Sequence, residues 1–112
     1  MALTDLGPFA DAGLLLLASL AAGPKHGYAM LSDVEALSGA RMGPGTLYTT
    51  LARLQQRGWI EALPAEEARR PYRLTDAGRA VLHSQLRRLE SFAASGLARL
   101  GPDGTTGRGA LA

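Results

Sequence analysis

The side chains best suited to binding chemistry lie in one stretch, from Gly43 to Trp59. At 100° per residue this stretch predicts a helix from Gly43 to about Gly58, with leucines on one arc. The opposite arc has no acid and consists of Gly45, Thr49, Ala52, Arg53 and Gln56. The tips of Thr49, Arg53 and Gln56 can hydrogen-bond to base edges in a DNA groove. The small first turn, Gly43-Pro44-Gly45, would let a large partner approach closely, and Pro44 suits the first helical position.

The sequence has no comparable pattern for catalysis. It contains no cysteine, which excludes disulfides, cysteine-type zinc fingers and thiol nucleophiles. The histidines, His26 and His83, are far apart and have no second ligand at metal-binding spacing. No Ser-His-Asp arrangement or phosphate-binding loop is visible. We therefore expect no enzyme activity, no catalytic residues, no metal and no cofactor.

Charge is distributed unevenly along the 112 residues. Lysine and arginine number 12 and acids number 10, for a net charge of +2. Residues 1–40 are net acidic and residues 89–112 are balanced, so the excess of base lies in residues 41–88, in Arg41, Arg53, Arg57, Arg69, Arg70, Arg73, Arg79, Arg87 and Arg88. A basic middle section suggests a polyanionic partner, and an ordinary solvated arginine surface is the alternative.

The remaining elements follow from apolar spacing and turn residues. We expect helices over about Pro8–Ala22, His26–Leu37 and Asp76–Leu100, and short strands over Trp59–Leu63 and Tyr72–Leu74 that form a hairpin. The apolar run in the first helix is too short to span a bilayer, and no base precedes it as in a signal sequence. It predicts a core helix and a cytoplasmic protein without a membrane partner. In the second helix, Tyr28, Leu31, Val34 and Leu37 suggest a core stripe.

The last predicted helix carries an apolar stripe at steps of four and three residues. At 1.5 Å per residue its 25 positions span roughly 37 Å, which is long for so small a domain. Such a heptad-like seam favours a homodimer, and the alternative is packing on the first helix of the same chain. The interface residues that we predict are Leu82, Leu86, Leu89, Phe92, Ala93, Leu97 and Leu100.

The order of elements predicts a mainly α fold with a small β-hairpin. It is a winged helix-turn-helix over residues 1–75, followed by a long C-terminal dimerisation helix over 76–100 and a disordered tail over 101–112. In helix-turn-helix proteins the second helix of the motif enters the major groove with its N-terminal residues first. The DNA-binding residues that we predict are Lys25, Tyr28, Gly45, Thr46, Tyr48, Thr49, Arg53, Gln56, Arg69 and Arg70. A core position is the alternative for Tyr28.

Three stretches, in this order, resemble the PadR family of transcriptional regulators. They are HGYAML at 26–31, GPGTLYTTLARLQQRGWIE at 43–61 and RRPYRLTDAGRAVL at 69–82. Gly43 departs from the family pattern, which often has a serine there, and the acids Glu66 and Glu67 stand beside the wing arginines. The length resembles the branch of the family with one C-terminal helix.

The resemblance implies a homodimeric repressor on a palindromic operator in double-stranded DNA. It also implies release by a small hydrophobic or aromatic ligand between the dimer halves, for which Phe92 and Trp59 are the candidates. The alternative function is a winged-helix protein–protein interaction module without DNA binding. That module would favour an acidic or apolar recognition face, whereas the polar arc of residues 45–56 contains no acid.

Overall fold

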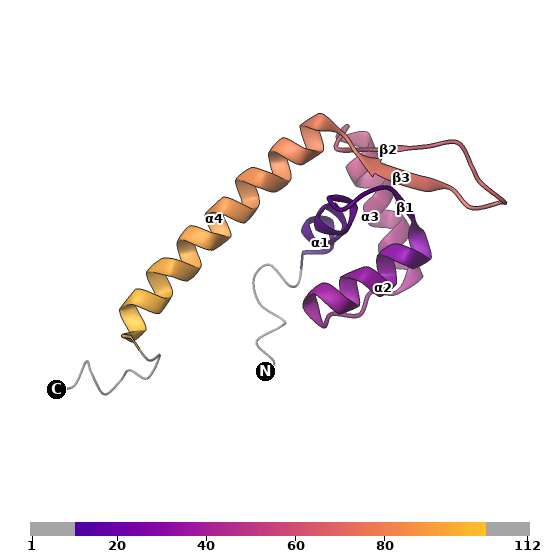
Figure 1. Cartoon of the computed structure of the whole chain (residues 1–112). Helices are drawn as coiled ribbons and strands as arrows, with labels where there is room; N and C mark the ends of the chain where they lie inside the picture. Colours follow the sequence, from indigo (N-terminus) through magenta and orange to yellow (C-terminus); the bar gives the residue numbers. More distant parts are fainter. Residues whose placement is uncertain (1–10, 103–112) are drawn as a thin grey trace. The chain divides into compact units, whose positions relative to one another are not determined.

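A computed structural model describes residues 11–102 of the chain (Figure 1). The chain divides into two compact units, with the boundary between Leu82 and His83. The elements are α1 (Ala12–Leu20), β1 (Lys25–His26), α2 (Gly27–Ser38), α3 (Pro44–Gln56), β2 (Ile60–Ala62), β3 (Pro71–Leu74) and α4 (Asp76–Leu100). This mainly helical fold with a small antiparallel sheet confirms the predicted fold class. The boundary lies inside α4, seven residues after the predicted domain end at residue 75.

The core of the first unit is built on α1, which is apolar on nearly all sides. Leu16, Leu17 and Leu20 are buried there, and Asp11 caps the helix by accepting a hydrogen bond from the Leu14 N–H at 3.1 Å. Residues 8–10 of the predicted first helix lie outside the described residues. The other helices and the sheet supply the rest of the core, namely Met30, Val34, Leu47, Leu51, Leu54, Ile60, Leu74 and Leu82.

The prediction of a core stripe on α2 is wrong for the first and last residues of that stripe. Tyr28 and Leu37 are exposed, and the buried residues of α2 are Gly27, Met30 and Val34. Steps of exactly three residues drift by 60° per step on a helix, so a series of three such steps turns halfway round it. Tyr28 therefore faces outward, and its alternative reading as a core residue is excluded.

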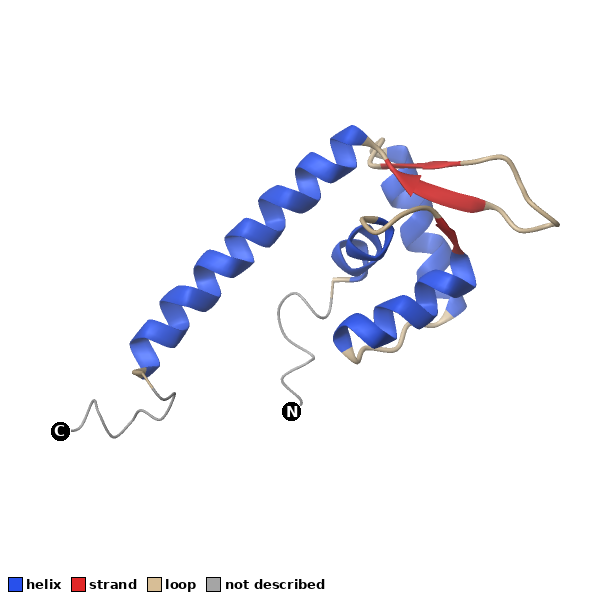
Figure 2. Cartoon of the chain, viewed as in Figure 1, coloured by secondary structure: helices blue, strands red, loops and turns tan. Residues whose placement is uncertain are grey.

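The sheet contains a strand that the sequence did not predict. Directly after Gly23-Pro24, the two-residue strand β1 pairs antiparallel with β3, and the order is β1-β3-β2 (Figure 2). The β2–β3 hairpin was predicted, and its register pairs Ile60 with Leu74. The loop between these two strands is the wing, and in Figure 2 it extends beyond the strands.

The wing closes with a tight turn at its tip. Glu66 and Arg69 exchange two backbone hydrogen bonds, and Glu67 and Ala68 between them have φ of 49° and 67°. Positive φ at both central residues is the mark of a two-residue type I′ hairpin turn, which normally uses Asn-Gly. The turn reverses the chain within two residues, so that Arg69 returns beside Glu66.

The first turn of α4 is fixed on the start of β2. Thr75 caps α4, with its hydroxyl accepting from the Gly78 N–H at 3.0 Å and donating to the Gly58 carbonyl at 2.6 Å. The Thr75 N–H donates to the Trp59 carbonyl at 3.0 Å. Gly78 is buried against the same carbonyl, with no room for a side chain.

Candidate nucleic-acid interface

The helix α3 presents two chemically different faces. Leu47, Thr50, Leu51 and Leu54 are buried in the core. The opposite face, which we call the α3 outer face, is exposed and consists of Gly45, Thr46, Thr49, Ala52, Arg53 and Gln56. The leucines were predicted to point inward, and their burial fixes the orientation of this polar face.

The N-terminus of α3 is open to a partner. Gly43 precedes the helix with extended backbone (φ −78°, ψ 162°) and no side-chain cap, and Pro44 occupies the first turn. Apart from its chain neighbours and the backbone of its own helix, a Cβ added to Gly43 or Gly45 would meet no heavy atom of the described residues within 4 Å. The packing of the described residues therefore does not require these glycines to be small, which leaves close approach of a partner as a reason for them.

Arg53 is the cation of the α3 outer face. Within residues 11–102 it makes no ion pair, whereas Arg41, Arg73 and Arg87 pair with acids. The neighbouring Arg57 is engaged differently, with its guanidinium 5.0 Å from the centre of the Trp59 ring. The hydrogen-bonding groups of Arg53 and Gln56 are thus available to a partner.

A second group of predicted residues meets beside α3. Tyr28 at the start of α2, Tyr48 on α3, and Arg69 and Arg70 on the wing line one hollow of about 370 Å³. His26, Gly27, Ala68 and Tyr72 complete its lining, and we call it the wing-base hollow. Arg69 donates to Nε2 of His26 at 3.3 Å, and Arg70 donates to the Leu63 carbonyl at 3.1 Å. Neither of these two bonds is made to a carboxylate.

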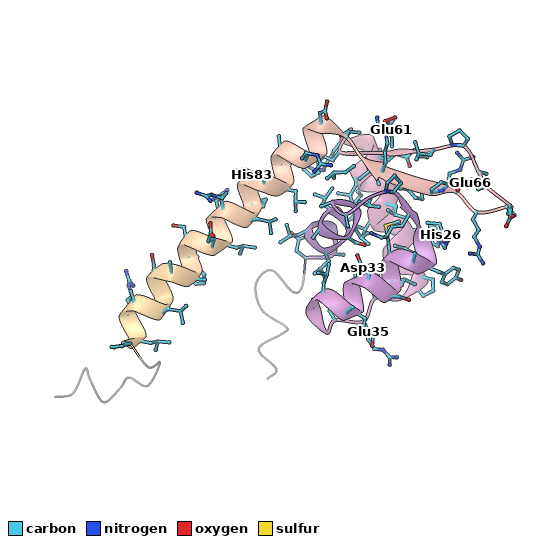
Figure 3. All side chains as sticks on the ribbon, in the orientation of Figure 1. His26, Asp33, Glu35, Glu61, Glu66 and His83 are labelled. Carbon is cyan, nitrogen blue, oxygen red and sulfur yellow. The ribbon has the colours of Figure 1, made fainter. Side chains whose placement is uncertain are left out.

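Lys25 lies apart from this group and is engaged inside the fold. Its Nζ donates to the Ser19 carbonyl at 2.5 Å and lies 3.5 Å from Asp33, which in turn accepts from the Ser19 hydroxyl at 2.7 Å. Ser19 is fully buried, and Asp33 extends from α2 toward α1 (Figure 3). This network ties α1 to α2 and gives Lys25 a structural role, so we do not include it among the proposed DNA contacts.

The residues predicted for the dimer interface and for ligand binding differ in burial and lie in different units. Leu82 is 4% exposed and belongs to the core of the first unit. In the second unit, Leu86, Phe92, Leu97 and Leu100 are exposed, with Phe92 at 77%. Trp59 packs partly buried against the core of the first unit under Arg57. Phe92 is thus free within its unit, whereas Trp59 already has packing partners.

His26 is a lining residue of the wing-base hollow that the sequence did not predict as a site residue. Its residue type and spacing had raised only the question of a metal ligand. It lies in β1, directly before α2 (Figure 3), and its partner Arg69 is 43 residues away along the chain. No spacing rule connects two such residues, because their meeting depends on β1 pairing with β3. Among the described residues, no group of three histidines or acids could hold a metal ion.

Comparison with models of known protein families shows to which family the chain belongs. The family model described as "Transcriptional regulator PadR-like family" matches residues 16–84, which include all of α2, α3, the wing and the start of α4. The chain belongs to the PadR-like family. Its members are transcriptional regulators and not enzymes, in agreement with the sequence analysis. Within the described residues, no helix combines the length and apolar character needed to cross a membrane.

Individual relatives agree with this membership. The chain is 45% identical over 75 residues to an uncharacterized 37.1 kDa protein in transposon TN4556 of Streptomyces fradiae, covering 67% of this chain and 22% of that protein. It is 44% identical over 71 residues to the transcriptional regulator Rv3488 of Mycobacterium tuberculosis, covering 61% and 65%. The chain thus spans less than two thirds of either relative.

One similar solved structure contains DNA. The crystal structure of Bacillus subtilis PadR in complex with operator DNA is similar over 66% of this chain and 45% of that chain. The identity is 25% and the TM-score is 0.60.

Proposed function

We propose that this PadR-like chain is a sequence-specific regulator that binds double-stranded DNA through the α3 outer face. The observation that carries the proposal is the composition of that face, which is exposed and polar, includes an arginine without an ion pair in residues 11–102, and contains no acid. The similarity to Bacillus subtilis PadR in complex with operator DNA supports the same function.

The proposal gives separate tasks to the two ends of the face. Gly45 and Thr46 at the start of α3 let the helix approach the duplex, and their free N–H groups face a backbone phosphate. Thr49, Arg53 and Gln56 point away from the core and read base edges in the major groove, where arginine pairs best with guanine and glutamine with adenine. Tyr28, Tyr48, Arg69 and Arg70 contact the DNA backbone beside α3.

We further propose a homodimer on a palindromic operator, assembled through the distal part of α4. The support is the apolar set Leu86, Leu89, Phe92, Ala93, Leu97 and Leu100, four of which are exposed large side chains. An exposed apolar stripe of this length loses its contact with water when a second copy covers it. A two-fold dimer would place two copies of α3 on two half-sites of the operator.

The regulatory outcome that we propose is repression, in which the bound dimer obstructs the promoter. A small hydrophobic or aromatic ligand would act at the α4 interface, where Phe92 offers the aromatic side chain. A ligand that binds the dimer better in its DNA-free form releases the operator, because it shifts the equilibrium by its difference in affinity. Trp59 is a weaker candidate for contacting the ligand, because it already packs against the core.

The test is binding of the purified chain to DNA from upstream of its own gene, measured by fluorescence anisotropy. A scrambled duplex of the same composition is the matched control, and both are measured at low and physiological salt. We expect preference for the upstream duplex and weaker binding of both as salt rises. Binding to neither duplex at either salt would refute the proposal and favour the protein–protein module.

A further inference from the structure

The wing-base hollow combines groups that bind phosphate and excludes groups that repel it. Its lining residues include two arginines (Arg69 and Arg70), His26 and two tyrosines (Tyr28 and Tyr48). None of the eight lining residues carries a carboxylate. We propose that this hollow holds one phosphate of the DNA backbone and that His26 is a positioning residue for Arg69. This inference rests on the proposed DNA-binding function.

A neighbouring hollow shows that the composition is specific to one side of the wing. That hollow, of about 580 Å³, is lined by Glu66, three prolines, Leu63, Ala65, His26 and Lys25. Its lysine is already bonded to Ser19 and Asp33, and its glutamate would repel a phosphate. The two hollows share His26, but of the two only the wing-base hollow is lined by arginines and tyrosines.

His26 holds Arg69 without neutralising it. Arg69 follows a turn that contains Glu66 and Glu67, and either carboxylate is an attractive partner for a guanidinium. In the described structure Arg69 bonds instead to Nε2 of His26, which accepts only as the neutral ring. A carboxylate partner would cancel the charge of Arg69, whereas the imidazole leaves it available to a phosphate.

Tyr48 has a fixed place at the hollow because it packs on Gly27. A Cβ added to Gly27 would lie 2.7 Å from the Tyr48 hydroxyl oxygen and 3.2 Å from Cζ. The ring therefore lies directly on the backbone of α2. Since α3 carries both Tyr48 and the proposed base-reading residues, a phosphate at Tyr48 belongs to the same duplex that α3 reads.

The consequence concerns the way in which the wing contacts DNA. Arg69 and Arg70 lie at or next to the tip turn along the chain, but their side chains bond back to His26 and to the Leu63 carbonyl. The turn at the tip consists of Glu66, Glu67, Ala68 and Arg69, so Arg69 starts at the tip and its side chain runs back to His26. We therefore expect the wing to contact the DNA backbone through the arginine side chains that run back along it, and not through the carboxylates of Glu66 and Glu67.

The experiment measures how the DNA affinity of the full chain depends on salt. Each phosphate contact contributes about 0.9 to the slope of log K against log salt on B-DNA. We expect Arg69→Ala to lower the slope by about one and to weaken binding by about the same factor on specific and scrambled duplexes. Arg87→Ala, which removes an arginine outside the hollow, should leave the slope unchanged and is the matched control.

Two substitutions at His26 test its positioning role. Glutamine offers an acceptor oxygen, so His26→Gln should retain most of the slope and affinity, whereas His26→Leu should lose as much as Arg69→Ala. The double variant His26→Leu/Arg69→Ala should be no worse than Arg69→Ala alone, because the histidine acts through the arginine. Thermal unfolding of each variant checks that the fold is unchanged.

The outcomes separate this inference from the proposed function. If the unchanged chain fails to bind any duplex, both are refuted. If it binds and Arg69→Ala leaves the slope as it was, only the phosphate site is refuted. Equal losses in His26→Gln and His26→Leu would overturn the positioning role. Displacement of DNA by millimolar inorganic phosphate, beyond the effect of chloride at equal ionic strength, would assign the hollow to free phosphate.

Discussion

Gly78 is the glycine at which an added methyl group has the clearest consequence. An alanine Cβ there would lie 1.9 Å from the Trp59 carbonyl oxygen, 2.8 Å from its carbon and 3.0 Å from Cδ1 of Leu74. An ordinary carbon–oxygen contact is about 3.3 Å or longer, so the first turn of α4 would have to move by more than about 1 Å. The obstacle is backbone, which cannot rotate away as a side chain can.

The movement would also break hydrogen bonds at the same place. The Trp59 carbonyl accepts from the Thr75 N–H, and the Thr75 hydroxyl donates to the Gly58 carbonyl. Overpacking costs about 1–3 kcal/mol, and each lost hydrogen bond costs about 1 kcal/mol. The higher helix propensity of alanine offsets about 1 kcal/mol of this loss in stability. We therefore expect Gly78→Ala to lower the free energy of unfolding by about 3 kcal/mol.

The assay is thermal unfolding followed by circular dichroism, with Gly45→Ala as the matched control. A loss of about 3 kcal/mol lowers the midpoint by about 12–24 °C in a domain of this size. The control adds the same methyl group to an exposed helical position with no atom within 4 Å, and it should raise the midpoint or leave it unchanged. A Gly78→Ala midpoint within about 3 °C of the unchanged chain would refute the reasoning, because 1 kcal/mol alone shifts it by about 4–8 °C.

Three further substitutions test the interface and the dimer. Arg53→Ala should cost about 1–3 kcal/mol on the specific operator and relax its specificity, measured by anisotropy, whereas equal loss on a scrambled duplex would make Arg53 a phosphate contact. Gly45→Ala should preserve thermal stability yet weaken operator binding, because its Cβ would lie where the duplex approaches; unchanged affinity would show that no close approach occurs there. Leu89→Asp should convert the dimer to a monomer in light scattering, and a variant that stays dimeric would exclude this seam.

The sequence predicted α3 in detail because one strong signal determines it. Leucines at 47, 51 and 54 recur at helical spacing, and their burial leaves the polar residues outside. The start of α4 was predicted for a similar local reason, since Thr75 is a good cap and its hydroxyl indeed accepts from the N–H three residues later. Both features depend on a few neighbouring residues.

Features that depend on distant pairing were missed. The strand β1 has two residues, too few to show an alternating pattern, and it exists because β3 pairs with it. The tip of the wing uses Glu67-Ala68 where a type I′ turn favours Asn-Gly, so the local sequence gave no turn signal there. Without β1 and this turn, the meeting of His26 and Arg69 could not be predicted.

The short strand β1 explains why two adjacent basic residues have different tasks. Successive side chains of a strand point to opposite faces of the sheet. Lys25 therefore turns toward α1 and α2, where Ser19 and Asp33 satisfy its charge, and His26 turns toward the wing, where it holds Arg69. The same pairing with β3 fixes both side chains. A change that weakens β1 should consequently affect the packing of α2 and the position of Arg69 together, which links the stability of the core to the proposed phosphate site.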